Sequence, residues 1–257
     1  MNPASHKHLR TLASLLGLAL LAGCAARSGS SAPDRDAGPA AGPRKPKVVW
    51  KPSEHFRKAS RTPADIDTIV IHTTEGNYDD KLSFVENHNR TWIGNVKYLQ
   101  KNDRGVSASF VVGRNGEIAQ LVAEKDVAFT STYYNDRSFG IEIAGWGDRK
   151  EMWTPGLLNG LADLVAYLCV RWGVEPVHAE GDAIRGPFQT LTKGGVSFPG
   201  YAGTGIVGHY QIQTPGSEAV KIGKYGSKSD PGPHFPWDDF IRSVRERIAR
   251  AGAKPRI

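Results

Sequence analysis

The sequence predicts an α/β domain in which helices flank a mixed central β-sheet. Short apolar runs with strand character recur between residues 67 and 212, and two of them are joined by a hairpin turn. Two amphipathic helical stripes accompany these runs. Strands that mix with helices and include a hairpin are typical of a mixed sheet covered by helices. The chain of 257 residues is long enough for one such domain and a tail.

Four segments carry the patterns expected of strands. They are residues 67–72 (DTIVIH), 107–122, 138–146 (SFGIEIAGW) and 205–212 (GIVGHYQI). The first is an apolar, β-branched run, which indicates a buried strand. The second contains two strands joined at Asn115-Gly116, a dipeptide that favours the positive φ angles of a tight hairpin turn.

Two helices are expected, one in the middle of the domain and one near its end. Thr154 is suited to cap the first helix, Pro155 fits its first turn, and Gly173 follows its end. Its apolar stripe consists of Leu157, Leu161, Leu164, Val165 and Leu168. Asp238 starts the second helix, whose stripe consists of Ile241, Val244 and Ile248.

The first 24 residues have the features of a secretory leader. Lys7 and Arg10 form a basic start, and a short apolar run ends in LAGC at Cys24. This ending resembles the bacterial lipobox, in which the cysteine is acylated; an ordinary signal peptide with an incidental cysteine is the alternative. Two or three acyl chains would anchor a protein stably. Because Ala25 resembles an outer-membrane sorting signal, we expect a lipid-anchored protein at a bacterial outer membrane, facing the periplasm.

The expected organisation has four parts. Residues 1–23 form the signal peptide, 24–47 a flexible tether, 48–250 the folded domain and 251–257 a tail. The tether is rich in Ala, Gly, Pro and Ser, a composition that buries too little apolar surface to offset its ordering entropy. With Cys24 acylated, Cys169 has no disulfide partner, and its place on the helical stripe indicates a small buried hydrophobe rather than a nucleophile.

The formal charge of +7 favours anionic partners such as cell-wall polymer or lipid headgroups. No arginine-rich helix or aromatic-basic pattern is present, so we expect no binding of nucleic acid. We expect the protein to be a monomer.

Two of the eight histidines stand apart from the others. His72 and His209 each end a predicted strand, at the rim of the sheet where sites are commonly built. Together with Asp230 they would supply two imidazoles and a carboxylate, a set that holds a catalytic zinc with one position open for water. Each histidine taken singly is more often structural, and the ligands come from separate segments. His55 and His88 lie in polar surroundings and are expected at the surface.

Six segments that carry recognisable motifs follow one another over residues 66–240. They are TIVIHTTEG, VSASFVVGRNGEIAQLVAEKDVAF, NDRSFGIEIAGW, LLNGLADLVAYLCVRWG, GIVGHYQI and KSDPGPHFPW. In this order they resemble the zinc-dependent N-acetylmuramoyl-L-alanine amidases of the type-2 amidase family. Phage endolysin amidases and peptidoglycan recognition proteins are related to that family.

The resemblance implies a role for each matching residue. His72, His209 and Asp230 would bind one zinc ion. Glu142 would activate the zinc-bound water, and Lys228 would stabilise the oxyanion. The fold implied is the mixed sheet flanked by helices that these amidases and recognition proteins share.

Elementary chemistry supports the same roles. Amide hydrolysis needs a nucleophile, a proton carrier and positive charge near the carbonyl oxygen. Glu142 lies between two isoleucines of a predicted strand, where a carboxylate is unfavourable unless it has a partner or a task. The alternative for Glu142 is a strand with one solvated face. Lys228 offers a positive charge two residues before Asp230.

The sequence departs from the family at two places on the expected substrate side. Ser109 stands where relatives often have histidine, and residues 129–132, Phe-Thr-Ser-Thr, stand where they often have Trp-His-Ala-Gly. The Gly-rich stretch within residues 178–204 is also longer than usual, and is expected to form a loop beside the groove or a surface insertion without consequence.

We therefore expect a zinc amidase that cleaves the amide between the lactyl group of N-acetylmuramic acid and L-alanine, in peptidoglycan or muropeptides. One alternative is a non-catalytic peptidoglycan-binding lipoprotein. Another is a zinc amidase that acts on a different acyl-peptide.

Overall fold

The computed structural model describes residues 42–76, 78–178, 188–193, 196–201, 204–212 and 228–253. All of them lie in one compact unit, Gly38–Ile257. The predicted signal peptide, Cys24 and most of the tether fall outside the described residues, so the lipid anchor and the four-part organisation stay predictions. Within the described ranges, no helix is both long enough and apolar enough to cross a membrane.

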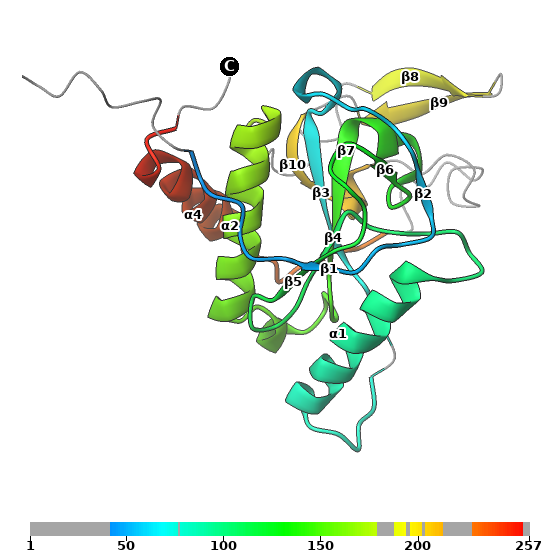
Figure 1. Cartoon of the computed structure of the whole chain (residues 1–257). Helices are drawn as coiled ribbons and strands as arrows, with labels where there is room; N and C mark the ends of the chain where they lie inside the picture. Colours follow the sequence, from blue (N-terminus) through cyan, green and yellow to red (C-terminus); the bar gives the residue numbers. More distant parts are fainter. Residues whose placement is uncertain are drawn as a thin grey trace, which may run out of the picture. The chain divides into compact units, whose positions relative to one another are not determined.

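The core of the unit is a six-stranded mixed sheet with the strand order β1-β5-β4-β7-β3-β10 (Figure 1). The strands are β1 (Val49–Trp50), β3 (Thr68–Thr73), β4 (Phe110–Val112), β5 (Ile118–Gln120), β7 (Ser138–Ile143) and β10 (Gly205–Gly208). Only β4 and β5 pair antiparallel in this sheet. The predicted strands and the mixed sheet are therefore confirmed.

Two small antiparallel ribbons accompany the main sheet. One pairs β2 (Phe56–Arg57) with β6 (Val127–Ala128), and the other pairs β8 (Phe188–Lys193) with β9 (Val196–Tyr201). The second ribbon lies within the Gly-rich stretch, which therefore contains a pair of strands where a loop was expected. Its place beside the groove and its alternative as a surface insertion without consequence both stay predictions.

The hairpin between β4 and β5 forms where it was predicted, but with a wider turn. Gly116 has a φ of 83°, whereas Asn115 keeps a negative φ. The N–H of Gly113 donates to the carbonyl of Glu117 at 2.9 Å, which closes the turn around both residues. Asn-Gly therefore supplies one left-handed residue rather than the two that the tightest hairpin turns require.

Three long helices are described: α1 (Phe84–Gln100), α2 (Pro155–Trp172) and α4 (Trp237–Arg250). α2 has the predicted ends, because the Thr154 side chain accepts a hydrogen bond from the N–H of Leu157 and Gly173 adopts a φ of 77°. α4 starts one residue before the expected Asp238.

α1, the helix that borders the site, was not predicted from the sequence. Its sequence is polar and contains several asparagines and a glycine, which weaken helix propensity. The local signal is the capping box of Ser83 and Glu86, in which each side chain bonds to the backbone of the other residue.

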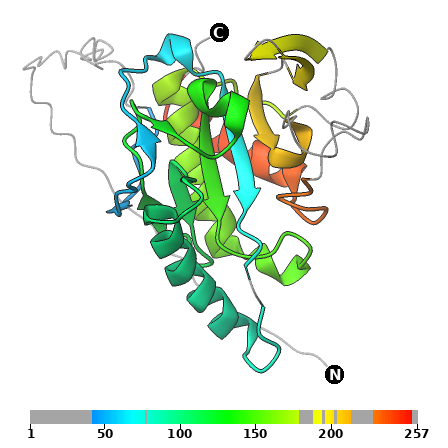
Figure 2. The same ribbon diagram turned by 90° about the vertical axis from the view of Figure 1, so that its right-hand side faces the viewer.

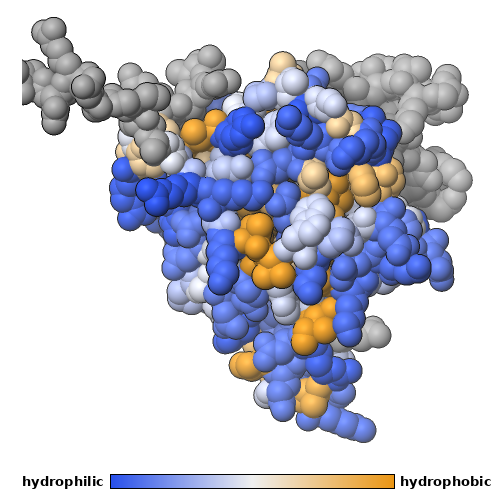
Figure 3. Space-filling view, in the orientation of Figure 1, coloured by the Kyte–Doolittle hydropathy of each residue, from blue (hydrophilic) through white to orange (hydrophobic). Residues whose placement is uncertain are grey.

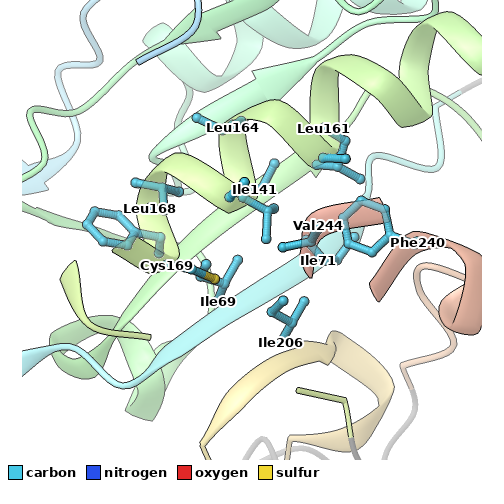
Figure 4. Close-up of a cluster of buried hydrophobic side chains, with 14 of the residues drawn as sticks. Ile69, Ile71, Ile141, Leu161, Leu164, Leu168, Cys169, Ile206, Phe240 and Val244 are labelled. Atoms are coloured by element: carbon cyan, nitrogen blue, oxygen red, sulfur yellow. The ribbon is translucent and has the colours of Figure 1, made fainter. Parts of the chain in front are cut away.

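The main hydrophobic core fills the space between the sheet and the pair α2 and α4 (Figure 4). Alternate residues of β3 and β7, such as Ile69, Ile71 and Ile141, point toward Leu161 and Val244 on these helices. Cys169 is buried in the same core, as predicted, and burial raises the pKa of its thiol to about 12. It is therefore a small apolar side chain without nucleophilic character.

α1 covers part of the opposite face of the sheet, where Val96 and Leu99 pack on β4 and β5 (Figure 2). The face of the domain seen in Figure 3 is mainly hydrophilic, with small separate apolar patches. Exposed apolar residues occur on β1, namely Val49 and Trp50, and on α1, namely Val85 and Ile93.

The hairpin turn packs directly against α2 through two glycines. A Cβ atom placed on Gly160 of α2 would lie 2.6 Å from both the Cα and the carbonyl oxygen of Gly116. Backbone atoms cannot move aside as a flexible side chain can, so the two segments are in contact only because both residues lack a side chain.

Replacing Gly160 by alanine should therefore destabilise the fold. Overpacking of this kind costs about 1–3 kcal/mol, which exceeds the helix propensity of up to about 1 kcal/mol that alanine adds. Chemical denaturation of the two proteins would measure the difference. Gly94→Ala is the matched control, because nothing lies within 4 Å of a Cβ placed there on α1, and it should be neutral or stabilising.

Candidate functional site

One face of β3 and β7 packs in the hydrophobic core, and the other face carries the candidate site residues. Odd-numbered residues of both strands point into the core with α2 and α4, so His72 and Glu142 lie on the other face. The strands are parallel, and their register places His72 directly beside Glu142. The two residues predicted to hold the metal and to carry a proton are therefore neighbours across one strand pair.

His209 reaches the same place from the next strand. β10 runs parallel to β3, with Gly208 beside Ile71, and His209 begins the short 3-10 turn that follows. The end of β10 thus lies beside the end of β3, as expected for two strands that both lead into a site at one rim.

Asp230 completes the group from the turn before α4. Its carbonyl accepts a hydrogen bond from the N–H of Tyr210 at 3.1 Å, which ties this turn to the end of β10. The turn also packs on the segment after β7, where a Cβ atom on Gly232 would lie 2.3 Å from the carbonyl oxygen of Gly147. Gly232 has a φ of 91°, so glycine suits this position for two reasons.

One atom from each of these three residues meets at a common point. His72 Nδ1 and His209 Nδ1 are 3.0 Å apart, and Asp230 Oδ2 lies 3.2 Å from the first and 3.1 Å from the second. All three side chains are buried. Ligand atoms placed tetrahedrally about 2.0–2.1 Å from one zinc ion would be about 3.3–3.4 Å apart, close to these separations. The group therefore fits a metal ion.

The charges of these residues suit a metal as well. Burial, together with the charge of His209, lowers the pKa of His72 to about 4, so its ring is neutral and keeps a free lone pair. Burial opposes ionisation of Asp230, but the neighbouring imidazoles of His209 and His72 outweigh it and hold the pKa of this carboxyl well below its usual range. A neutral imidazole and a carboxylate are the forms that bind metal ions.

The carboxyl group of Glu142 differs from that of Asp230 in its hydrogen bonding and in the direction of its pKa shift. Its Oε2 is shielded from solvent and has no hydrogen-bond partner among the described residues. Burial and then the charge of Asp230 raise its pKa to about 8, although the charge of Lys228 acts in the opposite direction. A buried carboxyl without a partner is unfavourable for the fold, and such groups concentrate at functional sites.

A cavity of about 360 Å³ opens beside these residues and is lined by His72, Glu142, His209 and Asp230. Its other lining residues are Thr73, Thr74, Glu75, Asn95, Tyr98, Leu99, Arg104, Val106, Ser107, Phe129, Thr130, Lys228 and Ser229. Lys228 is exposed at this cavity, so all five residues singled out from the sequence meet in one place. The wall formed by Asn95, Tyr98 and Leu99 was missed because α1 was missed.

The two departures from the family lie differently with respect to this cavity. Phe129 and Thr130 line it, as expected. Ser109 is buried directly before β4 and is absent from the lining, whereas Ser107, two residues earlier, is part of it. The expected place of Ser109 on the substrate side therefore stays a prediction.

The expectation that His88 lies at the surface is wrong. His88 is fully buried on the inner side of α1 against Phe84 and Trp146. Burial, with the charge of Arg114, lowers its pKa to about 4. Its polar neighbours in the sequence, Asn87 and Asn89, gave no sign of this, since a polar helix can still bury one face.

Comparisons with known proteins identify the family of this chain. A family model described as Amidase_2, N-acetylmuramoyl-L-alanine amidase, matches residues 62–233. N-acetylmuramoyl-L-alanine amidase A of Achromobacter lyticus is 25% identical over 206 residues, which cover 77% of this chain and 93% of that protein.

Among the solved structures that resemble this chain is the Staphylococcus aureus hydrolase AmiA in complex with its ligand. The two proteins are 18% identical with a TM-score of 0.52, and the match covers 83% of this chain and 89% of AmiA. A selenomethionine derivative of AmpD has 18% identity and a TM-score of 0.45, with 80% of this chain and 97% of AmpD covered. The likeness to AmiA supports the fold. Because the family model spans most of the chain, the chain belongs to the Amidase_2 family of N-acetylmuramoyl-L-alanine amidases.

Proposed function

We propose that this protein is a zinc-dependent amidase that hydrolyses the bond between the lactyl group of N-acetylmuramic acid and L-alanine in peptidoglycan or muropeptides. The observation that carries the proposal is the meeting of His72, His209 and Asp230 within 3.2 Å of one another. Beside them lies Glu142, whose Oε2 has no hydrogen-bond partner in the described part of the chain. Family membership supplies the substrate class.

His72, His209 and Asp230 would hold the zinc ion through Nδ1, Nδ1 and Oδ2. When bound, zinc lowers the pKa of a coordinated water to about 7 and polarises the scissile carbonyl. The cavity of about 360 Å³ beside these three residues would admit the substrate carbonyl.

Glu142 would take the proton from the attacking water and deliver it to the leaving amine of L-alanine. A carboxylate can carry a proton in both directions when its pKa is near the working pH, and burial raises the pKa of Glu142 toward this range. Its Oε2 forms no hydrogen bond within the described chain, so this oxygen is available to a reactant.

Lys228 would place its ammonium where negative charge develops on the carbonyl oxygen. Its charge already acts on both Glu142 and His72, lowering the pKa of each. Positive charge held in place before the reaction stabilises an anionic transition state without reorganisation.

Incubation of the full chain with purified muropeptides, followed by mass spectrometry and zinc quantification, tests the proposal. We expect about one zinc per chain and release of intact stem peptide from the sugar, both lost after treatment with a chelator. Bound zinc without this product would indicate another acyl-peptide substrate. Binding to sacculi without zinc or cleavage would instead support a non-catalytic peptidoglycan-binding protein.

A further inference from the structure

Ser131 lies against the side of His72 that faces away from the three-residue group. Its Oγ is 3.0 Å from His72 Nε2, and both side chains are buried. The other nitrogen of the same ring, Nδ1, approaches His209 and Asp230. The two nitrogens of this imidazole therefore have separate partners on opposite sides.

A metal bound at Nδ1 requires one tautomer of His72. A neutral imidazole carries one proton, and a metal can bind only the nitrogen that lacks it. If the proton is on Nε2, it is donated to Ser131 Oγ, and the lone pair of Nδ1 points toward Asp230 Oδ2 and His209. With the proton on Nδ1, that atom could not bind a metal.

The position of Ser131 is itself fixed by its neighbours. Asn135 Oδ1 accepts hydrogen bonds from the N–H groups of Thr130, at 3.0 Å, and Ser131, at 2.6 Å. One side-chain oxygen thus holds two consecutive peptide groups, so the Ser131 hydroxyl is presented to His72 in a defined place.

Gly140 allows this segment to come close enough. A Cβ atom on Gly140 would lie 2.4 Å from Thr130 Oγ1, so the Thr130 side chain occupies the space that a side chain at position 140 would fill. Gly140 and Glu142 lie on the same face of β7. The segment 129–131 therefore rests on the strand next to the proton-carrying residue and next to His72.

We propose that Ser131 is a positioning residue for the metal: it holds His72 with Nδ1 directed at the ion, and Asn135 holds Ser131. The proposal rests on the metal site of the proposed function. Hydrogen-bond partners of metal-bound histidines fix the tautomer and orientation of the ring, and their loss typically costs about 10–100-fold in metal affinity.

The test measures zinc affinity by competition with a chromogenic chelator in the full chain and three variants. Ser131→Ala should bind zinc about 10–100-fold more weakly. Ser131→Thr, which keeps the hydroxyl, should restore most of the affinity. Ser138→Ala is the matched control, because Ser138 is also buried and its Oγ donates to the carbonyl of Tyr134 at 2.7 Å, away from His72. It should lose stability but bind zinc as the wild type does.

Nuclear magnetic resonance of ¹⁵N-labelled histidines supplies a readout that a purely structural role would not change. In the zinc-bound wild type, the His72 Nε2 proton should be slow to exchange, and in Ser131→Ala it should exchange much faster. If Ser131→Ala cannot be recovered folded, Asn135→Ala replaces it. That variant removes the hydrogen bond to the Ser131 N–H. We expect it to lose less zinc affinity than Ser131→Ala should, and its His72 Nε2 proton should also exchange faster than in the wild type.

Equal zinc affinity in Ser131→Ala and Ser138→Ala would overturn this proposal alone. If the variants show the expected order of zinc affinities while the wild type releases no stem peptide from muropeptides, only the proposed function fails. Absence of zinc binding by the wild type would overturn both.

Discussion

Replacing Glu142 by glutamine should lower the rate of muropeptide hydrolysis by about 10²–10⁴-fold, the usual contribution of a positioned proton carrier. Glutamine has nearly the same shape and can occupy the same place on β7, but it cannot accept and return a proton. The steady-state rates of the two proteins, measured at saturating muropeptide, give the effect on kcat.

The zinc content of Glu142→Gln distinguishes loss of the proton carrier from loss of the metal. Glu142 is not among the three residues whose atoms meet, so Glu142→Gln should still bind about one zinc per chain. Loss of zinc along with activity would show that Glu142 acts through the metal site rather than on the substrate. A loss of activity below tenfold would contradict the role of Glu142 as the proton carrier.

Glu117→Gln provides a matched control on the hairpin turn. Its carboxylate accepts a hydrogen bond from the N–H of Asn115 at 2.8 Å, and an amide oxygen can accept the same bond. Glu117 does not line the cavity. The Glu117→Gln variant should therefore hydrolyse muropeptides at the rate of the wild type within experimental error.

Two of the three candidate metal ligands could be predicted from local patterns in the sequence. His72 and His209 each follow a short apolar strand, and parallel strands bring their ends to one rim of the sheet. Asp230 has no such pattern of its own. Its assignment depended on the resemblance of the KSDPGP turn to a family motif, and the structure brings it to the two histidines.

The wall of the cavity could not be predicted in the same way. α1 is polar on most of its surface, and its place is decided by the packing of Val96 and Leu99 on β4 and β5, which no local pattern reveals. The capping box of Ser83 and Glu86 could have indicated where the helix begins. Without α1, the contribution of Tyr98 to the site could not be foreseen.

The partner of His72 was also beyond the reach of sequence patterns. Ser131 and His72 are 59 positions apart, and their contact depends on the missing side chain at Gly140 and on the Asn135 amide. The departure from the family at residues 129–132 was visible in the sequence. Its consequence became visible only when the segment was placed on β7.

Replacing Asp230 by alanine should remove both zinc binding and hydrolysis. The substitution leaves two imidazoles, and a third protein ligand is needed for the three-ligand sites typical of catalytic zinc. If the metal supplies about 4 kcal/mol of transition-state stabilisation, its loss lowers the rate by about 10³-fold. The same muropeptide assay, with zinc quantified in each sample, measures both effects.

Thermal unfolding with and without zinc tests the Asp230 prediction without any substrate. A ligand present at 100 times its Kd stabilises the folded state by about 2.7 kcal/mol, which raises the Tm of a domain of this size by about 5–10 °C. The wild type should show this rise, and Asp230→Ala should not. His234→Ala is the control, because His234 is exposed in the same turn and absent from the cavity lining, so its Tm should rise with zinc as in the wild type. An equal rise in Asp230→Ala would mean that zinc binds elsewhere, and the three-residue group would then have to be abandoned as the metal site.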